Sequence, residues 1–134
     1  MPHLVVLYTK NLDTQTDMTQ LCRALADAML SIRDEADTQV FPTGGVRVLA
    51  YPAAHAAVAD GQRDYAFAYL NLRMGRGRSA DVKKRTGEQL LATARVHFES
   101  LFAERYLGLT LQIDEGPEVF DAKHSTIHPL FAGR

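Results

Sequence analysis

Residues 65–79, YAFAYLNLRMGRGRS, combine three local patterns that together decide the fold. Small or aliphatic residues alternate with aromatic and polar ones from Tyr65 to Met74, and this period of two predicts a strand with two different faces. The two glycines of GRGRS predict a tight turn after the strand. Ser79 or Asp81 can then serve as the N-cap of a helix.

The segment after this turn predicts a helix followed by another strand. Apolar residues at helical spacing continue the helix to about Tyr106: Leu90, Leu91, Ala94, Phe98, Leu101 and Phe102. From Leu107 to Ile113, leucines and an isoleucine alternate with smaller or polar residues, which predicts a further strand. Together these elements form a β-α-β unit, whose two strands are expected to pair in parallel.

The same order of elements occurs in the first part of the chain. His3–Tyr8 is a short run rich in valine and leucine, which predicts a buried strand. Thr16 or Asp17 is a candidate N-cap for the helix that follows. Its apolar residues lie at helical spacing: Met18, Leu21, Cys22, Leu25, Met29 and Ile32. FPTGG predicts a loop, and Val46–Tyr51 predicts the second strand.

We therefore predict an α/β (α+β) fold of tandem β-α-β units, with a four-stranded sheet and two helices on one face. The expected boundaries are a single domain over residues 1–134, with halves at about 2–60 and 61–115 and a tail at 116–134 that contacts another subunit. Both faces of the sheet carry apolar residues, so we expect other subunits to cover the face without helices. A ferredoxin-like monomer has the same order of elements, so the order alone leaves both arrangements open.

The composition excludes several classes of protein. Apolar residues make up 46% and charged residues 23%, as in soluble globular proteins, and a net charge of −1 provides no broad attraction to nucleic acid or to an anionic membrane. No apolar stretch approaches the ~18 residues of a transmembrane helix, and no signal-peptide pattern is present. The one cysteine, Cys22, is expected to pack on an apolar helix face. We therefore expect a cytoplasmic protein.

Metal and nucleophilic catalysis find little support in the sequence. Of the five histidines, His124 and His128 have ligand-like spacing, but Pro129 follows them and no carboxylate or cysteine lies at supporting spacing. No G-x-S-x-G motif is present. We therefore expect no metal site.

Three residues are candidates for binding or catalysis. Arg78 lies in the GRGRS turn beside a helix N-terminus, where its guanidinium suits a carboxylate, although such a turn is also a common structural feature. Arg47 lies in an apolar strand, where it either pairs with an acid at an edge or faces a cavity. Pro2 either begins a strand or, if Met1 is removed, carries a secondary amine that can act as a general base.

Five ordered segments resemble one known family: MPHLVV, VFPTGGVR, DGQRDYAF, GRGRS and STIHPLF. The chain resembles the 5-carboxymethyl-2-hydroxymuconate Δ-isomerases of the tautomerase superfamily over nearly its whole length. The resemblance implies a homotrimer and an isomerase that uses no metal or organic cofactor. It also implies that Pro2 is the general acid/base, and that Arg47 and Arg78 contact the substrate.

The implied reaction belongs to the catabolism of homoprotocatechuate-type aromatics. A dienol that bears carboxylates would lose the proton of its 2-hydroxyl and gain one at C-5, giving a conjugated ketone. The chemistry requires removal of Met1, because the nitrogen of Pro2 is otherwise an amide. Two alternatives remain open: a tautomerase for another 2-hydroxydienoate or a phenylpyruvate-like enol, and a non-catalytic trimeric module that binds small carboxylates.

Overall fold

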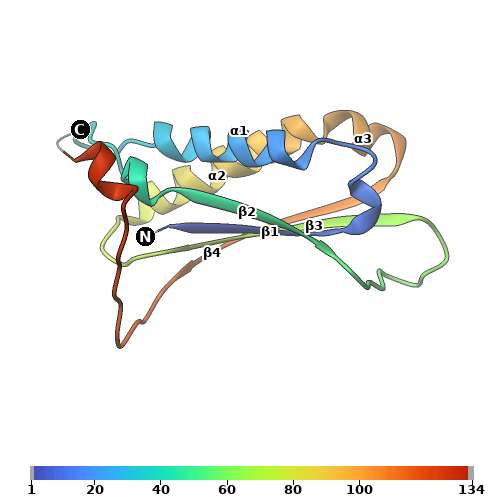
Figure 1. The fold of residues 1–134 in the computed structure, drawn as a ribbon. Helices are drawn as coiled ribbons and strands as arrows, with labels where there is room; N and C mark the ends of the chain where they lie inside the picture. The colour runs from blue at the N-terminus through green and yellow to red at the C-terminus, as the bar shows by residue number, and fades with distance from the viewer. Residues whose placement is uncertain (1, 133–134) are drawn as a thin grey trace.

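The computed structural model describes residues 2–132, and the order strand–helix–strand occurs in it twice (Figure 1). The first unit consists of β1 (His3–Thr9), α1 (Met18–Ser31) and β2 (Arg47–Ala53). The second consists of β3 (Tyr65–Met74), α2 (Ala80–His97), α3 (Glu99–Glu104) and β4 (Tyr106–Glu115). Three short 3-10 helices complete the described chain: η1 (Lys10–Leu12), η2 (Thr43–Gly45) and η3 (His128–Phe131).

The four strands form one mixed sheet in the order β2-β1-β3-β4. Each unit pairs its own strands in parallel, and the two units join at the centre through the antiparallel pairing of β1 with β3. Figure 1 shows α1 and α2 on one face of this sheet and no helix on the other. The predicted fold, tandem β-α-β units with two helices on one face of a four-stranded sheet, is confirmed.

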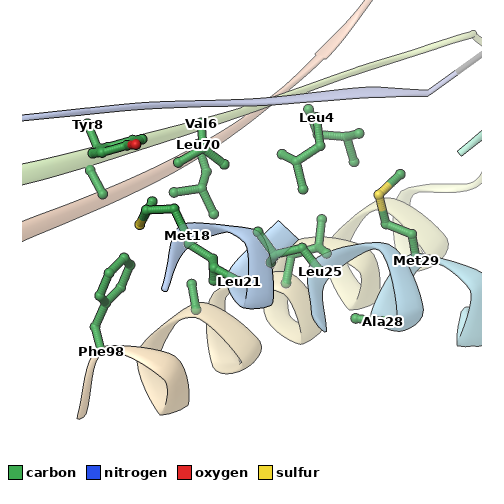
Figure 2. Packing of buried hydrophobic residues seen from close by; sticks show 14 of the residues in the cluster. Leu4, Val6, Tyr8, Met18, Leu21, Leu25, Ala28, Met29, Leu70 and Phe98 are labelled. Atoms are coloured by element: carbon green, nitrogen blue, oxygen red, sulfur yellow. The ribbon is translucent and has the colours of Figure 1, made fainter. Parts of the chain in front are cut away.

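The hydrophobic core lies between the sheet and the helices and draws on both units. Figure 2 shows Leu4 and Val6 of β1 above Leu21 and Leu25 of α1, and all four side chains are fully buried. Buried residues of the second unit, Leu70 among them, belong to the same cluster. Burying one such leucine contributes about 1.5–3 kcal/mol, so the core supplies most of the driving force for folding.

Two candidate N-caps were proposed for each long helix, and in each case the structure shows that one of them is the cap. The side chain of Asp17 accepts a hydrogen bond from the backbone N–H of Gln20, and Ser79 accepts one from Val82, both at 3.1 Å. The Thr16 hydroxyl instead lies 2.8 Å from Nε2 of His97, which ties the start of α1 to the end of α2.

Three details differ from the expectations. The helix predicted to run to about Tyr106 is broken at Phe98 (φ −94°, ψ 8°), whose fully buried side chain fixes the corner between α2 and α3. In β1 the helix-facing side chains Leu4, Val6 and Tyr8 are buried, whereas Leu7 on the open side is 48% exposed, because no helix covers that face. Cys22 is half-buried rather than buried.

Among residues 2–132, none of the helices has the length and apolar character needed to span a bilayer.

Candidate active site

Four strand ends meet at one edge of the sheet and bring distant parts of the chain together. His3 pairs with Arg47 on one side and with Arg73 on the other. Since neighbouring strands lie about 4.8 Å apart and paired residues point to the same face, these three side chains form a row across the open face. We call it the basic row: Arg47, His3 and Arg73.

Pro2 precedes β1 at this edge and is buried. It lines a cavity of about 670 Å³, here called the Pro2 cavity, together with Arg78, Pro42 and the tail residues Lys123, Ser125 and His128. Pro2 thus lies at a cavity large enough for a small ligand, which a catalytic role for its nitrogen would require.

Arg78 is held in place by the chain around it. Its guanidinium donates to the carbonyl oxygens of Gly75, at 3.1 Å, and Val40, at 3.3 Å, and lies 5.2 Å from the centre of the Phe41 ring. A guanidinium carries five N–H donors, and within the described residues these two bonds leave three for a ligand. Arg76 of the same turn is exposed and lines neither this cavity nor the next.

A second cavity of about 750 Å³ lies beside the first and is here called the basic cavity. The whole basic row lines it, together with Glu118, Asp121 and other residues of the tail. Lys123 and Ser125 line both cavities, so the two are neighbours across one short stretch of tail.

The tail closes this edge of the molecule. In Figure 1 it leaves β4, passes the N-terminal end of β1 and rises to η3, which packs against η2. Close packing here requires a glycine, because a Cβ at Gly44 would lie 2.7 Å from Cα of His128.

Electrostatics at the site follow from the basic row. Burial is the main factor that lowers the pKa of His3, and the charges of Arg47 and Arg73 lower it further. The pKa of Asp121 is lowered mainly by its hydrogen bond with Lys123, at 2.7 Å. His3 is therefore neutral near pH 7, and the site as a whole favours an anion.

The structure thus brings together two of the three predicted site residues. Pro2 and Arg78 share one cavity, whereas Arg47 lies in the basic cavity. His124 and His128 do not form a metal pair: η3 begins only at His128, and residues 2–132 contain no group of three or more histidine, cysteine or acidic side chains suited to a metal.

Sequence reasoning missed the contributions of His3, Arg73, Lys123 and His128 to the two cavities. One feature of the sequence could have indicated Arg73: it is a charged residue on the face of β3 that otherwise carries mainly aromatic side chains. Its position beside His3 depends on the β1–β3 register, which local patterns do not contain.

Comparison with known proteins identifies the family. The family model for 5-carboxymethyl-2-hydroxymuconate isomerase matches residues 2–131. The chain belongs to this family. It is therefore an isomerase.

Individual relatives agree with this assignment. The chain is 30% identical to the 5-carboxymethyl-2-hydroxymuconate Delta-isomerase of Escherichia coli over 131 residues, which cover 98% of this chain and 99% of that protein. A crystal structure of a 5-carboxymethyl-2-hydroxymuconate delta-isomerase has a TM-score of 0.94 at 56% identity, over 98% of this chain and 93% of the other. The 5-carboxymethyl-2-hydroxymuconate isomerase of Deinococcus radiodurans R1 has a TM-score of 0.85 at 37% identity, covering 97% and 93%.

More distant structures share the fold alone. A fused 4-OT symmetric trimer matches with a TM-score of 0.57 at 17% identity, over 90% of this chain and 93% of the other.

Proposed function

We propose that this isomerase converts 5-carboxymethyl-2-hydroxymuconate from its dienol to the conjugated ketone, with Pro2 as general acid/base. The observation that carries the proposal is the shared cavity of Pro2 and Arg78. A base and a fixed carboxylate-binding group at one cavity are the two parts that a proton shift in an anionic substrate requires.

In the proposed reaction, the amine of Pro2 accepts the proton of the substrate's 2-hydroxyl as the C-2 oxygen becomes a carbonyl. The electron pairs of the diene move along the chain, and the resulting ammonium returns a proton to C-5. No atom is gained or lost overall. Arg78 holds a carboxylate at the reacting end and stabilises the negative charge that develops on the carbonyl oxygen.

The surroundings of Pro2 suit a base. A secondary amine in bulk water is mostly protonated at neutral pH, so it needs an environment that disfavours the ammonium form. Pro2 is buried, and the guanidinium of Arg78 at the same cavity adds a positive charge. Both factors favour the neutral amine.

Two preparations of the same chain test this proposal. One begins at Pro2 and the other retains Met1, and intact-mass measurement establishes which is which. We expect the trimmed protein to isomerise the dienol and the untrimmed protein to be inactive, because an amide nitrogen has no basic lone pair. Equal activity of the two preparations would refute the role of Pro2. A phenylpyruvate-like enol, assayed in parallel, reports on the breadth of the substrate class.

We also propose that the chain is a single domain that assembles into a cytoplasmic homotrimer acting in aromatic catabolism. The open face of the sheet carries half-exposed apolar side chains, including Leu7, Leu49 and Tyr51. Val119 and Phe120 in the tail are almost fully exposed, which suits a subunit contact. The fused 4-OT protein that shares the fold is itself a trimer.

A further inference from the structure

The basic cavity contains charges that the proposed proton transfer does not use. Arg73 is the member of the basic row that lies farthest along the sheet from Arg47, on β3. Its backbone is paired on both sides, with His3 of β1 and with Asp114 of β4. A cation on a rigid strand at the edge of a cavity is well placed to select among ligands.

Within the described residues, Arg73 forms one ion pair, with Glu118 of the tail. The distance between Nη2 and Oε1 is 3.4 Å, longer than the 2.7–2.9 Å usual for such pairs, and both side chains are exposed, at 52% and 38%. In the single protomer the pair is exposed, and pairs of this kind contribute little to stability, so a competing carboxylate can displace Glu118 at small cost.

The chain makes room for this carboxylate. A Cβ at Gly116 would lie 1.8 Å from Oε1 of Glu118 and 2.9 Å from Nη2 of Arg73. The absence of a side chain at Gly116 therefore creates a space beside Arg73 that a carboxylate fills, and here the carboxylate belongs to the tail. Glu118 is thus the carboxylate that lies beside Arg73 in this structure.

Arg73 in the basic cavity lies close along the backbone to Pro2 in the Pro2 cavity. Pro2 is adjacent in sequence to His3, and His3 pairs directly with Arg73. Consecutive Cα atoms lie about 3.8 Å apart and neighbouring strands about 4.8 Å apart, so the backbones at Pro2 and Arg73 lie within the length of a six-carbon diacid. The two cavities also share Lys123 and Ser125 in their walls.

We propose that Arg73 binds the carboxylate of the substrate's carboxymethyl branch, and that Glu118 occupies this position until the substrate displaces it. The inference rests on the proposed function, because it assigns a second subsite to the same substrate. Arg78 holds the reacting end, and Arg73, beside the neutral imidazole of His3, distinguishes a substrate with the branch from one without it.

The test uses Arg73→Gln and Glu118→Gln in protein trimmed to Pro2, with 5-carboxymethyl-2-hydroxymuconate and with 2-hydroxymuconate, which lacks the branch. We expect Arg73→Gln to raise KM for the branched substrate roughly 10- to 100-fold, the range for a lost hydrogen bond to a charged group, with kcat nearly unchanged. KM for 2-hydroxymuconate should change less than about 3-fold, an effect of general charge alone. Glu118→Gln should lower KM for the branched substrate severalfold, because the competing carboxylate is gone.

A control variant and a binding assay complete the design. Arg63→Gln removes an arginine at the opposite end of the sheet, where it donates to the Tyr106 hydroxyl, and should leave both KM values unchanged. Calorimetry with the saturated acids 2-carboxymethylhexanedioate and hexanedioate measures the same selectivity without any reaction. Arg73→Gln should abolish the preference for the branched acid.

The opposite signs for the two variants make the inference easy to refute. Equal losses on both substrates with Arg73→Gln, or a higher KM with Glu118→Gln, would show that the pair has a structural role only. If no preparation isomerises the dienol, the proposed function fails, but calorimetry still decides whether Arg73 selects the branched acid.

Discussion

Gly44→Ala tests whether the tail holds the site together. The added Cβ would lie 2.7 Å from Cα of His128, a contact with backbone that no side-chain rotation can relieve. An ordinary contact begins at 3.4 Å, so η2 and η3 must separate by about 0.7 Å. His128 lines the Pro2 cavity and Gly44 lines the basic cavity, so this shift deforms both.

The expected magnitudes follow from where the strain is relieved. Overpacking of a close contact usually costs roughly 1–3 kcal/mol, and we expect about 1 kcal/mol because η3 has no buried residues. That corresponds to a decrease in Tm of roughly 2–8 °C for a chain of this size. Misplacement by about 1 Å can reduce a rate 10²-fold, so we expect kcat/KM to fall roughly 10-fold or more. Activity should therefore suffer more than stability.

Thermal unfolding followed by circular dichroism and steady-state kinetics on the dienol measure these two effects. Gly87→Ala is the matched control: it makes the same substitution within α2, where the new Cβ would lie 3.4 Å from the flexible Cδ1 of Ile113. It should raise stability by about 0.5–1 kcal/mol, since glycine weakens a helix, and leave kinetics unchanged. If the Gly44→Ala and Gly87→Ala variants had the same Tm and the same kinetics, the contact between η2 and η3 would be disproved.

Three further predictions concern the cavity, the helices and the assembly. Arg78→Ala should lower kcat/KM by roughly 10- to 100-fold, equivalent to about 1.5–3 kcal/mol for a lost charge-assisted contact, without loss of fold by circular dichroism; unchanged kinetics would exclude Arg78 from the site. Burial is the main factor that lowers the pKa of His97 in the folded protein. Between the ordinary histidine pKa and this lower folded pKa, the unfolded chain therefore binds more protons than the folded one. The free energy of unfolding should decrease as pH falls through this range. Denaturant unfolding at a series of pH values should show a weaker decrease for His97→Gln than for the exposed-site control His55→Gln, and identical profiles would contradict this assignment. Sedimentation equilibrium should give three times the mass of the chain at micromolar concentration, and a stable monomer would count against the trimer.

Local patterns predicted the elements well because the signals for them are local. The alternation of residues 65–74 identified both faces of β3, and the capping candidates included Asp17 and Ser79, which cap α1 and α2. The break at Phe98 could not be predicted, since helical spacing continues across it and no glycine or proline marks it. The corner forms because Phe98 is drawn into a core that the sequence does not display.

The site was harder to predict because it depends on pairing between distant segments. Pro2 and Arg78, two of the three residues proposed from the sequence, line one cavity, and each carries a local signal: an imino acid before a strand and an arginine in a glycine turn. The basic row is a product of register, which joins residues 3, 47 and 73 across three strands. The tail has no periodicity, so the positions of Glu118 and His128 at the two cavities emerged only from the structure.

Because β1 and β3 run in opposite directions, the first residues of these two neighbouring strands lie at opposite ends of the sheet. Pro2 precedes one of these starts and Asp64 the other. Removal of Met1 can expose an amine at the first, but the nitrogen of residue 64 is held in a peptide bond and has no basicity. The second start instead has a structural role, in which Asn11 donates to Asp64 and to the carbonyl of Tyr65, and Arg105 pairs with Asp64. Joining two similar units in one chain therefore makes their two starts chemically different: only the first can carry a free amine, and the second is held by hydrogen bonds and an ion pair to neighbouring segments.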